Sequence, residues 1–255
     1  KARPGYKIIQ CDLGTAEVYY AAMLSGDQFL QKAFIDKLDF HSYVAKQMFN
    51  LPVDVDQVKK QYPNERQYAK AITFGIMYQA GPAKIAETVN KDAKAGEEIS
   101  VAQSRQFIQK YFNEAKALKK FIDGSNQQIE NHAFIYSFFG RKRRLPEAKS
   151  PNQGVSKHAI RSGVNFLVQS VASDINVLGV VDLVQWIEDN DYLEDILPFT
   201  VVHDSIVSEV RDDLVDEYIE NARRCIQKDR GLSIPGCPIK VDFEVGPSWG
   251  ELEEL

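Results

Sequence analysis

The segment Arg66–Tyr78 has an apolar side and a polar side that repeat with the period of an α-helix. One side is a stripe that can dock onto a core, made of Ala69, Ile72, Ile76 and Met77. The opposite face holds residues four positions apart, which drift by only about 40° per step: Arg66, Lys70, Phe74 and Tyr78. Cations suit a triphosphate and aromatic rings suit a base, so the pattern predicts a helix that holds a nucleotide. The same pattern also occurs on ordinary amphipathic helices whose polar face is only solvated.

Two strand-like segments each present an acid. Tyr6–Asp12 is a short β-type run that ends at Asp12. Phe199–Val210 predicts a hairpin whose β-branched arms meet at a tip that contains Asp204. A carboxylate at such an end is held rigidly while it stays open to a ligand. Asp12 and Asp204 are therefore candidates for one site, which they can share if a divalent metal lies between them.

The remaining pattern predicts an α+β fold, in which helices back an antiparallel sheet and a mostly helical lobe is inserted. A further strand is expected at Ile239–Val245, and a loose one at Phe134–Phe139. Leu51–Val58 is expected to be a connector and Lys91–Glu98 a mobile loop. Further helices are expected over 15–24, 29–35, 39–49, 83–89, 100–120 (capped by Ser100 with Gln103), 120–131, 155–187 and 212–228.

Composition narrows the class of protein. The chain has 255 residues, of which 44% are hydrophobic and 26% charged, as is usual for a globular protein. Its net charge of −5 argues against a polycation that binds nucleic acid through its whole field, although a local basic groove stays possible. No apolar run approaches the roughly 20 residues of a membrane span, so a soluble, cytoplasmic protein with no membrane partner is expected. The three cysteines suggest neither a disulfide framework nor a zinc site.

Two polar groups are candidates for contacts with nucleic acid. Four consecutive cations follow the 134–139 strand and are candidates for phosphate contacts, although such runs often form only a solvated edge: Arg141, Lys142, Arg143 and Arg144. Three residues at four-residue spacing on the 155–187 helix can hydrogen-bond base edges or sugars, although they also fit a plain polar flank: Arg161, Asn165 and Gln169.

Two carboxylates from separate strands and a basic helix together fit metal-assisted phosphoryl transfer. Two Mg²⁺ ions about 4 Å apart would activate a 3′-hydroxyl and stabilise a leaving pyrophosphate. Magnesium prefers oxygen ligands and keeps several waters, so two aspartates and substrate phosphates suffice.

At this point the sequence resembles the family-A DNA polymerases, the group of bacterial DNA polymerase I and several phage replicative enzymes. The first of three motifs in the same order is Asp12–Glu17, read as DLGTAE. The second is Arg66-x3-Lys70-x3-Phe74-Gly75-x2-Tyr78, and the third is Val202-His203-Asp204. Phe139-Gly140-Arg141, Asn165 with Gln169, and Val245–Trp249 also match, so the resemblance covers nearly the whole chain.

The resemblance implies template-directed DNA synthesis from dNTPs on a primer 3′-OH, in a bacterial or phage-infected host cell. Asp12 and Asp204 would hold two Mg²⁺ ions with help from the Leu13 carbonyl, and Lys70 would protonate the leaving pyrophosphate. Three side chains would grip the triphosphate: His41, Arg66 and Lys70.

The resemblance also assigns residues that would contact the base, the sugar and the DNA. Phe74 would stack on the incoming nucleotide, while Tyr78 with Glu17 would crowd the sugar 2′ position and select deoxyribose. A Phe rather than a Tyr at position 74 implies discrimination against dideoxynucleotides. The primer-template would be contacted near its growing end by Arg161, Asn165, Gln169 and His203.

The implied architecture is a palm of residues 1–36 and 151–255, with fingers at 37–150. Nothing matches the family's thumb or 3′→5′ exonuclease, so a shortened chain, or one that works with a second polypeptide carrying those parts, is expected. Ser205 stands where the family usually has Glu, Gln79 where it has Gly, and Tyr19 where it has Arg. The first departure removes a carboxylate beside the metals, whereas both metal aspartates are kept.

Three other functions stay open. A single-subunit RNA polymerase shares much of this layout, although Glu17 as a sugar gate favours deoxynucleotides. A two-metal nuclease could use Asp12 and Asp204 but would not need the polar face of the Arg66–Tyr78 helix. The chain could also be a catalytically idle structural subunit of a replication complex.

Overall fold

The computed structural model describes residues 1–91 and 98–255. The chain divides into two compact units, and each is described by itself. Unit 1 contains Lys1–Ala16 and Gln169–Leu255, whereas unit 2 contains Glu17–Val168. The boundary falls inside the longest helix, α9 (Gln153–Asp189), so that its two ends belong to different units. The palm and finger boundaries at residues 36 and 150 stay predictions.

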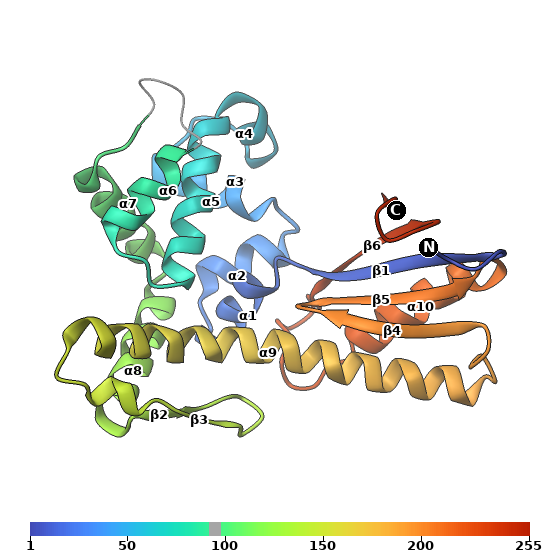
Figure 1. Ribbon diagram of the computed structural model, residues 1–255. Helices are drawn as coiled ribbons and strands as arrows, with labels where there is room; N and C mark the ends of the chain where they lie inside the picture. The colour runs from blue at the N-terminus through green and yellow to red at the C-terminus, as the bar shows by residue number, and fades with distance from the viewer. Residues whose placement is uncertain (92–97) are drawn as a thin grey trace. The chain divides into compact units, whose positions relative to one another are not determined.

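Unit 1 is built on a five-stranded antiparallel sheet, and the expected fold class is confirmed (Figure 1). The strand order is β4-β5-β1-β6-β7, which places the N-terminal strand in the middle of strands from the other end of the chain. The strands are β1 (Tyr6–Gly14), β4 (Ile196–Val202), β5 (Ser205–Arg211), β6 (Lys240–Gly246) and β7 (Glu253–Glu254).

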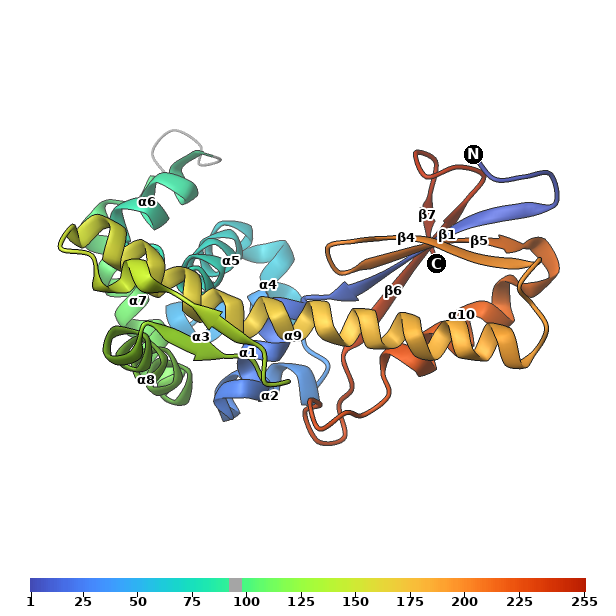
Figure 2. The same ribbon diagram turned by 60° about the horizontal axis from the view of Figure 1, so that its bottom comes forward.

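Buried and more exposed side chains alternate along β1, which shows which side of the sheet faces the core. Ile9, Cys11 and Leu13 are all at most 2% exposed. Helix α10 (Val215–Ile226) covers this side, because its Tyr218 hydroxyl is hydrogen-bonded to Ser208, the partner of Ile9 across the β1–β5 pair. Figure 2 shows the C-terminal half of α9 on the same side as α10. The other side of β1 carries Gln10 and Asp12, as the period of two requires.

The predicted hairpin is confirmed as β4–β5, which turns at His203-Asp204. His203 has a φ of 57°, a left-handed conformation that tight hairpin turns use and that His adopts more readily than most residues. Asp204 therefore lies in the turn, next to the first residue of β5.

Unit 2 is mainly helical and contains a small hairpin before the N-terminal part of α9. Its helix α5 contacts α3, α4, α6 and α7, so it lies at the centre of the bundle. The hairpin β2 (Phe134–Tyr136) and β3 (Lys142–Arg144) follows α8. The helices are α1 (Ala16–Ser25), α2 (Gln28–Ile35), α3 (Phe40–Phe49), α4 (Val55–Gln61), α5 (Pro63–Met77), α6 (Pro82–Lys91), α7 (Val101–Glu114) and α8 (Lys116–His132).

Three expectations about local structure are wrong. The connector at Leu51–Val58 is helical from Val55, because Val58 is fully buried in the bundle. The α7–α8 break comes at Ala115 rather than near Lys120, since the buried Asp27 carboxylate accepts a hydrogen bond from the Leu118 N–H in the first turn of α8.

The third wrong expectation is the strand over 134–139, because the observed strand β2 stops at Tyr136. A turn follows in which the Gly140 N–H donates to the Ser137 carbonyl and Gly140 has a φ of 79°. The Ser100–Gln103 capping box is confirmed. The loop expected at Lys91–Glu98 lies for the most part outside the described residues, which omit 92–97.

Within the described ranges, only α9 has the length and mean hydropathy of a helix that could cross a membrane. About 44% of its apolar window is buried inside the protein. In unit 1 it packs closely on α10, because a Cβ on Gly179 would lie 2.9 Å from the Ile226 side chain. A core helix passes the same test of length and composition, and the packing on α10 favours that interpretation.

Candidate active-site residues

The two acids predicted to share a site lie together in unit 1. Asp12 is directly opposite Ser205 in the β1–β5 pair, and the Ser205 hydroxyl donates a hydrogen bond of 2.5 Å to Asp12 Oδ1. Asp204 is the residue before Ser205. Opposed residues in antiparallel strands have Cα atoms about 5 Å apart and neighbours are about 3.8 Å apart, so the two aspartate Cα atoms lie within about 9 Å. That spacing lets their side chains reach a common pair of ions.

A third acid beside Asp12 was missed from the sequence. Asp242 is the partner of Asp12 on its other side, in the β1–β6 pair. Its Oδ1 pairs with Lys240 Nζ at 2.5 Å, and a Cβ on Gly14 would lie 2.9 Å from its Oδ2. Gly14 thus leaves room for the Asp242 carboxylate beside β1. Among the described residues no three acids, histidines or cysteines are grouped closely enough to hold a metal, so Asp242 does not complete a cluster.

The two-sided character of α5 is present as predicted. Ala69, Ile72 and Ile76 are at most 3% exposed, while Met77 is only partly buried. On the other face Lys70 and Tyr78 are exposed, and Arg66 and Phe74 are half-buried. A hollow of about 370 Å³ runs along this face and is lined by Lys70, Phe74 and Tyr78 together with residues of α6.

Gly75 explains why α6 comes so close to α5. A Cβ at this position would lie 2.5 Å from the Ile85 side chain, so a larger residue would clash unless Ile85 or its helix shifted. The glycine in the second motif therefore shapes the wall of this hollow.

Arg66 is held by an acid that the sequence did not single out. Its Nε and Nη2 donate to the two carboxylate oxygens of Asp39 at 2.8 and 2.9 Å, a bidentate pair. Asp39 also caps α3 by accepting from the Ser42 N–H. Burial alone would raise the pKa of Asp39, but the hydrogen bonds from Arg66 and Ser42 hold it well below its usual value. The aspartate is therefore ionised and fixes the Arg66 guanidinium.

His41 is buried in the same region, at 6% exposure, and its ring centroid lies 5.7 Å from that of Phe74. Burial lowers the pKa of His41 to about 4, so the ring is neutral at pH 7. Its Nδ1 is buried and makes no hydrogen bond within the described part of the chain. A buried neutral imidazole beside Phe74 fits a hydrogen-bonding role better than a charge role.

Tyr78 and Glu17, the predicted sugar gate, are brought together within unit 2. The Tyr78 hydroxyl donates a short hydrogen bond to the Glu17 carboxylate. The residues are 61 positions apart, and the contact joins the end of α5 to the first turn of α1.

Gln79 lies in the turn that ends α5. The Ala80 N–H donates to the Gly75 carbonyl and the Gln79 N–H to the Ile76 carbonyl, which is the Schellman pattern. Gln79 occupies the left-handed position of this motif with a φ of 50°. Its side-chain oxygen accepts from Asn126 Nδ2 of α8 at 3.2 Å, so the glutamine replaces a preferred glycine at a strained position and gains a contact.

The predicted DNA contacts are spread over both units. Arg141, Lys142 and Arg144 are exposed on the β2–β3 hairpin, whereas Arg143 is half-buried and donates to the Ser162 hydroxyl at 2.6 Å. On α9, Arg161 and the half-buried Asn165 belong to unit 2 and the exposed Gln169 belongs to unit 1. His203 is exposed in the β4–β5 turn.

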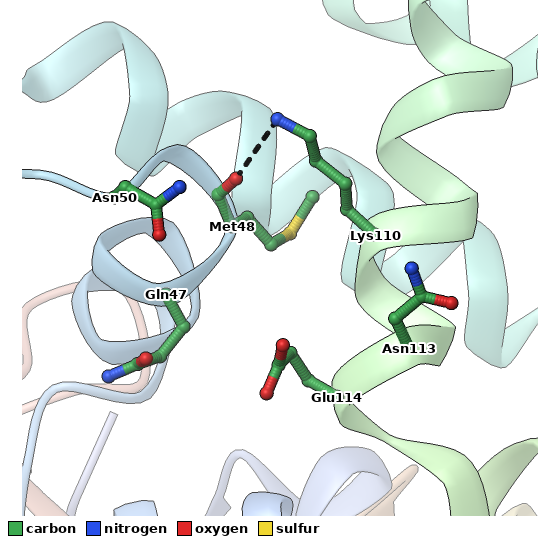
Figure 3. Close-up of a pocket in the computed structure, with 6 residues that line it drawn as sticks. All are labelled: Gln47, Met48, Asn50, Lys110, Asn113 and Glu114. Carbon is green, nitrogen blue, oxygen red and sulfur yellow. Dashed lines mark hydrogen bonds between the residues drawn. The ribbon is translucent and has the colours of Figure 1, made fainter.

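A smaller hollow between α3 and α7 has a structural explanation. Figure 3 shows Lys110 of α7 reaching across it, where its Nζ donates to the Met48 carbonyl at 3.5 Å. Met48 lies in the last turn of α3, where carbonyl groups lack helical partners and a cation is favourable. This contact satisfies the helix end and needs no ligand.

Three comparisons with known proteins agree on one family. The model of the family described as DNA polymerase family A matches residues 1–251. The DNA polymerase of Escherichia phage T5 is 49% identical over 258 residues, covering 95% of this chain and 30% of that protein. DNA polymerase I of Pseudomonas aeruginosa is 29% identical over 251 residues, covering 98% of this chain and 25% of that protein.

Among solved structures, the POL domain of Pol1 from M. smegmatis, in a complex with DNA primer-template and dNTP, matches with a TM-score of 0.83. The sequence identity is 25%, and the match covers 97% of this chain and 41% of that one. The chain thus spans less than a third of the length of these two curated relatives.

Proposed function

This chain belongs to DNA polymerase family A, and from that premise we propose that it catalyses template-directed addition of dNTPs to a primer 3′-OH. The observation that carries the proposal is the β1–β5 arrangement, in which Asp12 receives the Ser205 hydrogen bond beside Asp204. One carboxylate on β1 and one in the turn that leads into the adjacent β5 are the ligands that this chemistry needs.

The donor set fits two Mg²⁺ ions. Asp12 and Asp204 would hold them, since magnesium prefers carboxylate oxygen and keeps several waters. When bound there, the ions supply activation of the 3′-hydroxyl and neutralise charge on the leaving pyrophosphate. The backbone carbonyl of Leu13 is the further oxygen proposed as a ligand. Ser205 holds Asp12 through its hydroxyl in place of an additional carboxylate.

The polar face of α5 would bind the nucleotide. Arg66 offers a guanidinium with five N–H donors, of which Asp39 occupies two, so three remain for phosphate oxygens. Lys70 is exposed beside it and would protonate the leaving pyrophosphate. His41 would donate a neutral hydrogen bond, and Phe74 would stack on the incoming base.

The Tyr78–Glu17 pair would select deoxyribose. A hydrogen bond that ties the two side chains together makes the pair a stiff wall, and a ribose 2′-hydroxyl would meet it. Steric exclusion suits this position, because a hydrophobic pocket alone discriminates only weakly against a single added hydroxyl.

DNA is the proposed macromolecular partner. The exposed cations Arg141, Lys142 and Arg144 and the partly buried Arg143 would contact phosphates. The growing end would be contacted by Arg161, Asn165, Gln169 and His203. We also infer palm segments at 1–36 and 151–255 and fingers at 37–150. A thumb and an exonuclease would then be supplied by further sequence or by a second polypeptide.

Primer extension with Mg²⁺ and dNTPs tests the proposal, with Asp204→Ala as the key variant. Asp216→Ala is the matched control, because Asp216 is an exposed aspartate in the same unit. We expect extension that survives Asp216→Ala and is abolished by Asp204→Ala. Extension unaffected by Asp204→Ala would overturn the metal assignment, ribonucleotide use would indicate an RNA polymerase, and DNA degradation without dNTPs a nuclease. No extension, either alone or with a companion chain, would indicate a structural subunit.

A further inference from the structure

Three large aromatic side chains are exposed close together on the β2–β3 hairpin of unit 2. Tyr136 is 48% exposed, Phe138 52% and Phe139 42%. We call these three residues the aromatic cluster. Rings of this size are normally buried, so three exposed rings on one hairpin indicate a binding surface rather than scattered exposure.

The cluster is held in place by its surroundings. The Phe138 and Phe139 rings pack edge to face with centroids 5.4 Å apart. Arg143 fixes the hairpin to α9 through the Ser162 hydroxyl at 2.6 Å and lies 5.3 Å from the Phe166 ring. A binding surface on such a hairpin loses little freedom when it takes up a ligand.

Positive charge accompanies the rings. Lys142 Nζ lies 3.8 Å from the Phe134 centroid and 5.6 Å from that of Tyr136, so the cation is held over the aromatic surface. Arg141 and Arg144 are exposed on the same hairpin. A ligand for this surface therefore has flat apolar faces together with repeated negative charge.

A hollow of about 240 Å³ adjoins the cluster and is partly lined by Tyr136 and Phe138. Polar groups from Ser125, Gln128 and Ser137 also line it, and the Gln128 side chain is exposed. An amide at the rim can hydrogen-bond the edge of a base whose face lies against a ring.

We propose that the aromatic cluster and the neighbouring cations bind unpaired DNA, with bases stacked on Tyr136, Phe138 and Phe139 and phosphates on Arg141, Lys142 and Arg144. Single-stranded DNA is the ligand because its base faces are open, whereas stacking in a duplex hides them. In a polymerase the strand that fits is the unpaired part of the template, a step that rests on the proposed function. A protein partner would need the apolar area but not the cations.

The test is fluorescence anisotropy of the whole chain with a labelled oligo-dT strand and with a blunt duplex. The double variant Tyr136→Leu/Phe138→Leu keeps apolar side chains but removes two stacking faces. Since one stacked ring is worth roughly a fivefold to hundredfold change in affinity, we expect oligo-dT binding to weaken at least about tenfold. Binding of the blunt duplex should stay within about twofold. Phe199→Ala is the control, because Phe199 is a ring of similar exposure, 46%, on β4.

Equal oligo-dT binding by the double variant and the parent would overturn the proposal, as would an equal loss in the Phe199→Ala control. Circular dichroism melting establishes that each variant is folded. The same variants in primer extension separate this proposal from the proposed function. We expect slower extension on a template with a long 5′ overhang but not on one with a single unpaired nucleotide. If no variant or parent extends any primer, the proposed function fails while the oligo-dT result still stands by itself.

Discussion

The Arg66–Asp39 pair offers the sharpest test of how the polar face of α5 binds a triphosphate. The perturbation is Asp39→Asn, which removes the charge that fixes the guanidinium. Asn caps a helix as well as Asp does, so the hydrogen bond to the Ser42 N–H at the start of α3 is kept. The change therefore acts mainly on Arg66.

The magnitude follows from the geometry of the pair. Charge-assisted hydrogen bonds contribute about 1.5–3 kcal/mol when they are shielded from water. The Asp39 side chain is 43% exposed and that of Arg66 21%, so solvent screening reduces the contribution to about 1 kcal/mol. In the variant, the Arg66 side chain must be ordered again at each binding event. We therefore expect the KM for dNTP to rise about fivefold, with kcat almost unchanged.

The assay is steady-state single-nucleotide incorporation at varied dNTP concentration. Asp36→Asn is the matched control, because Asp36 pairs with Lys32 at 2.5 Å in the same unit and forms no ion pair with α5 within the described part of the chain. Asp39→Ala adds the loss of the cap, so it should lower the free energy of unfolding by about a further 1 kcal/mol while raising KM by the same factor as Asp39→Asn. An unchanged or lower KM in Asp39→Asn would refute the reasoning, since it would mean that Asp39 competes with the triphosphate.

Further predictions concern the neighbouring residues. Phe74→Tyr should bring dideoxynucleotide incorporation closer to that of deoxynucleotides in a competition assay. Glu17→Ala, which removes the partner of the Tyr78 hydroxyl, should raise ribonucleotide incorporation on the order of tenfold, about 1.4 kcal/mol of lost selectivity; unchanged selectivity would contradict the gate. Gln79→Gly should unfold at a higher temperature than Gln79→Ala, because both lose the Asn126 contact but only Gly relieves the left-handed φ, by about 1 kcal/mol. The pKa of His41 is about 4 when folded and about 6.5 when unfolded, so stability should fall by up to roughly 3 kcal/mol as pH drops from 6.5 to 4. His41→Gln should flatten that part of a denaturation–pH profile.

The elements that could be predicted from sequence are those with a strong local period. Strand β1, the β4–β5 hairpin and α5 all follow the alternation or helical spacing of their own residues. The order and spacing of the motifs predicted membership of DNA polymerase family A, which the comparisons confirm. The same local signal could not set where α7 ends, because the break depends on Asp27, a residue 91 positions before its partner Leu118.

Several neighbours of the candidate residues were outside the reach of sequence reasoning. Asp242 faces Asp12 only because the register of the β1–β6 pair places it there, 230 positions further along the chain. Asp39 was visible as a helix start, but nothing local indicates that its carboxylate also binds Arg66, 27 positions away.

By itself the sequence determined the two-sided helix, the hairpin with an acid at its tip and the order of the motifs, because backbone geometry turns residue spacing directly into shared faces. Tertiary structure decided which acid holds which cation, that His41 is buried and neutral, and that Ser205 holds Asp12. Those outcomes depend on strand register and burial, which arise from contacts between distant segments. Such contacts produce no periodic pattern in the local sequence.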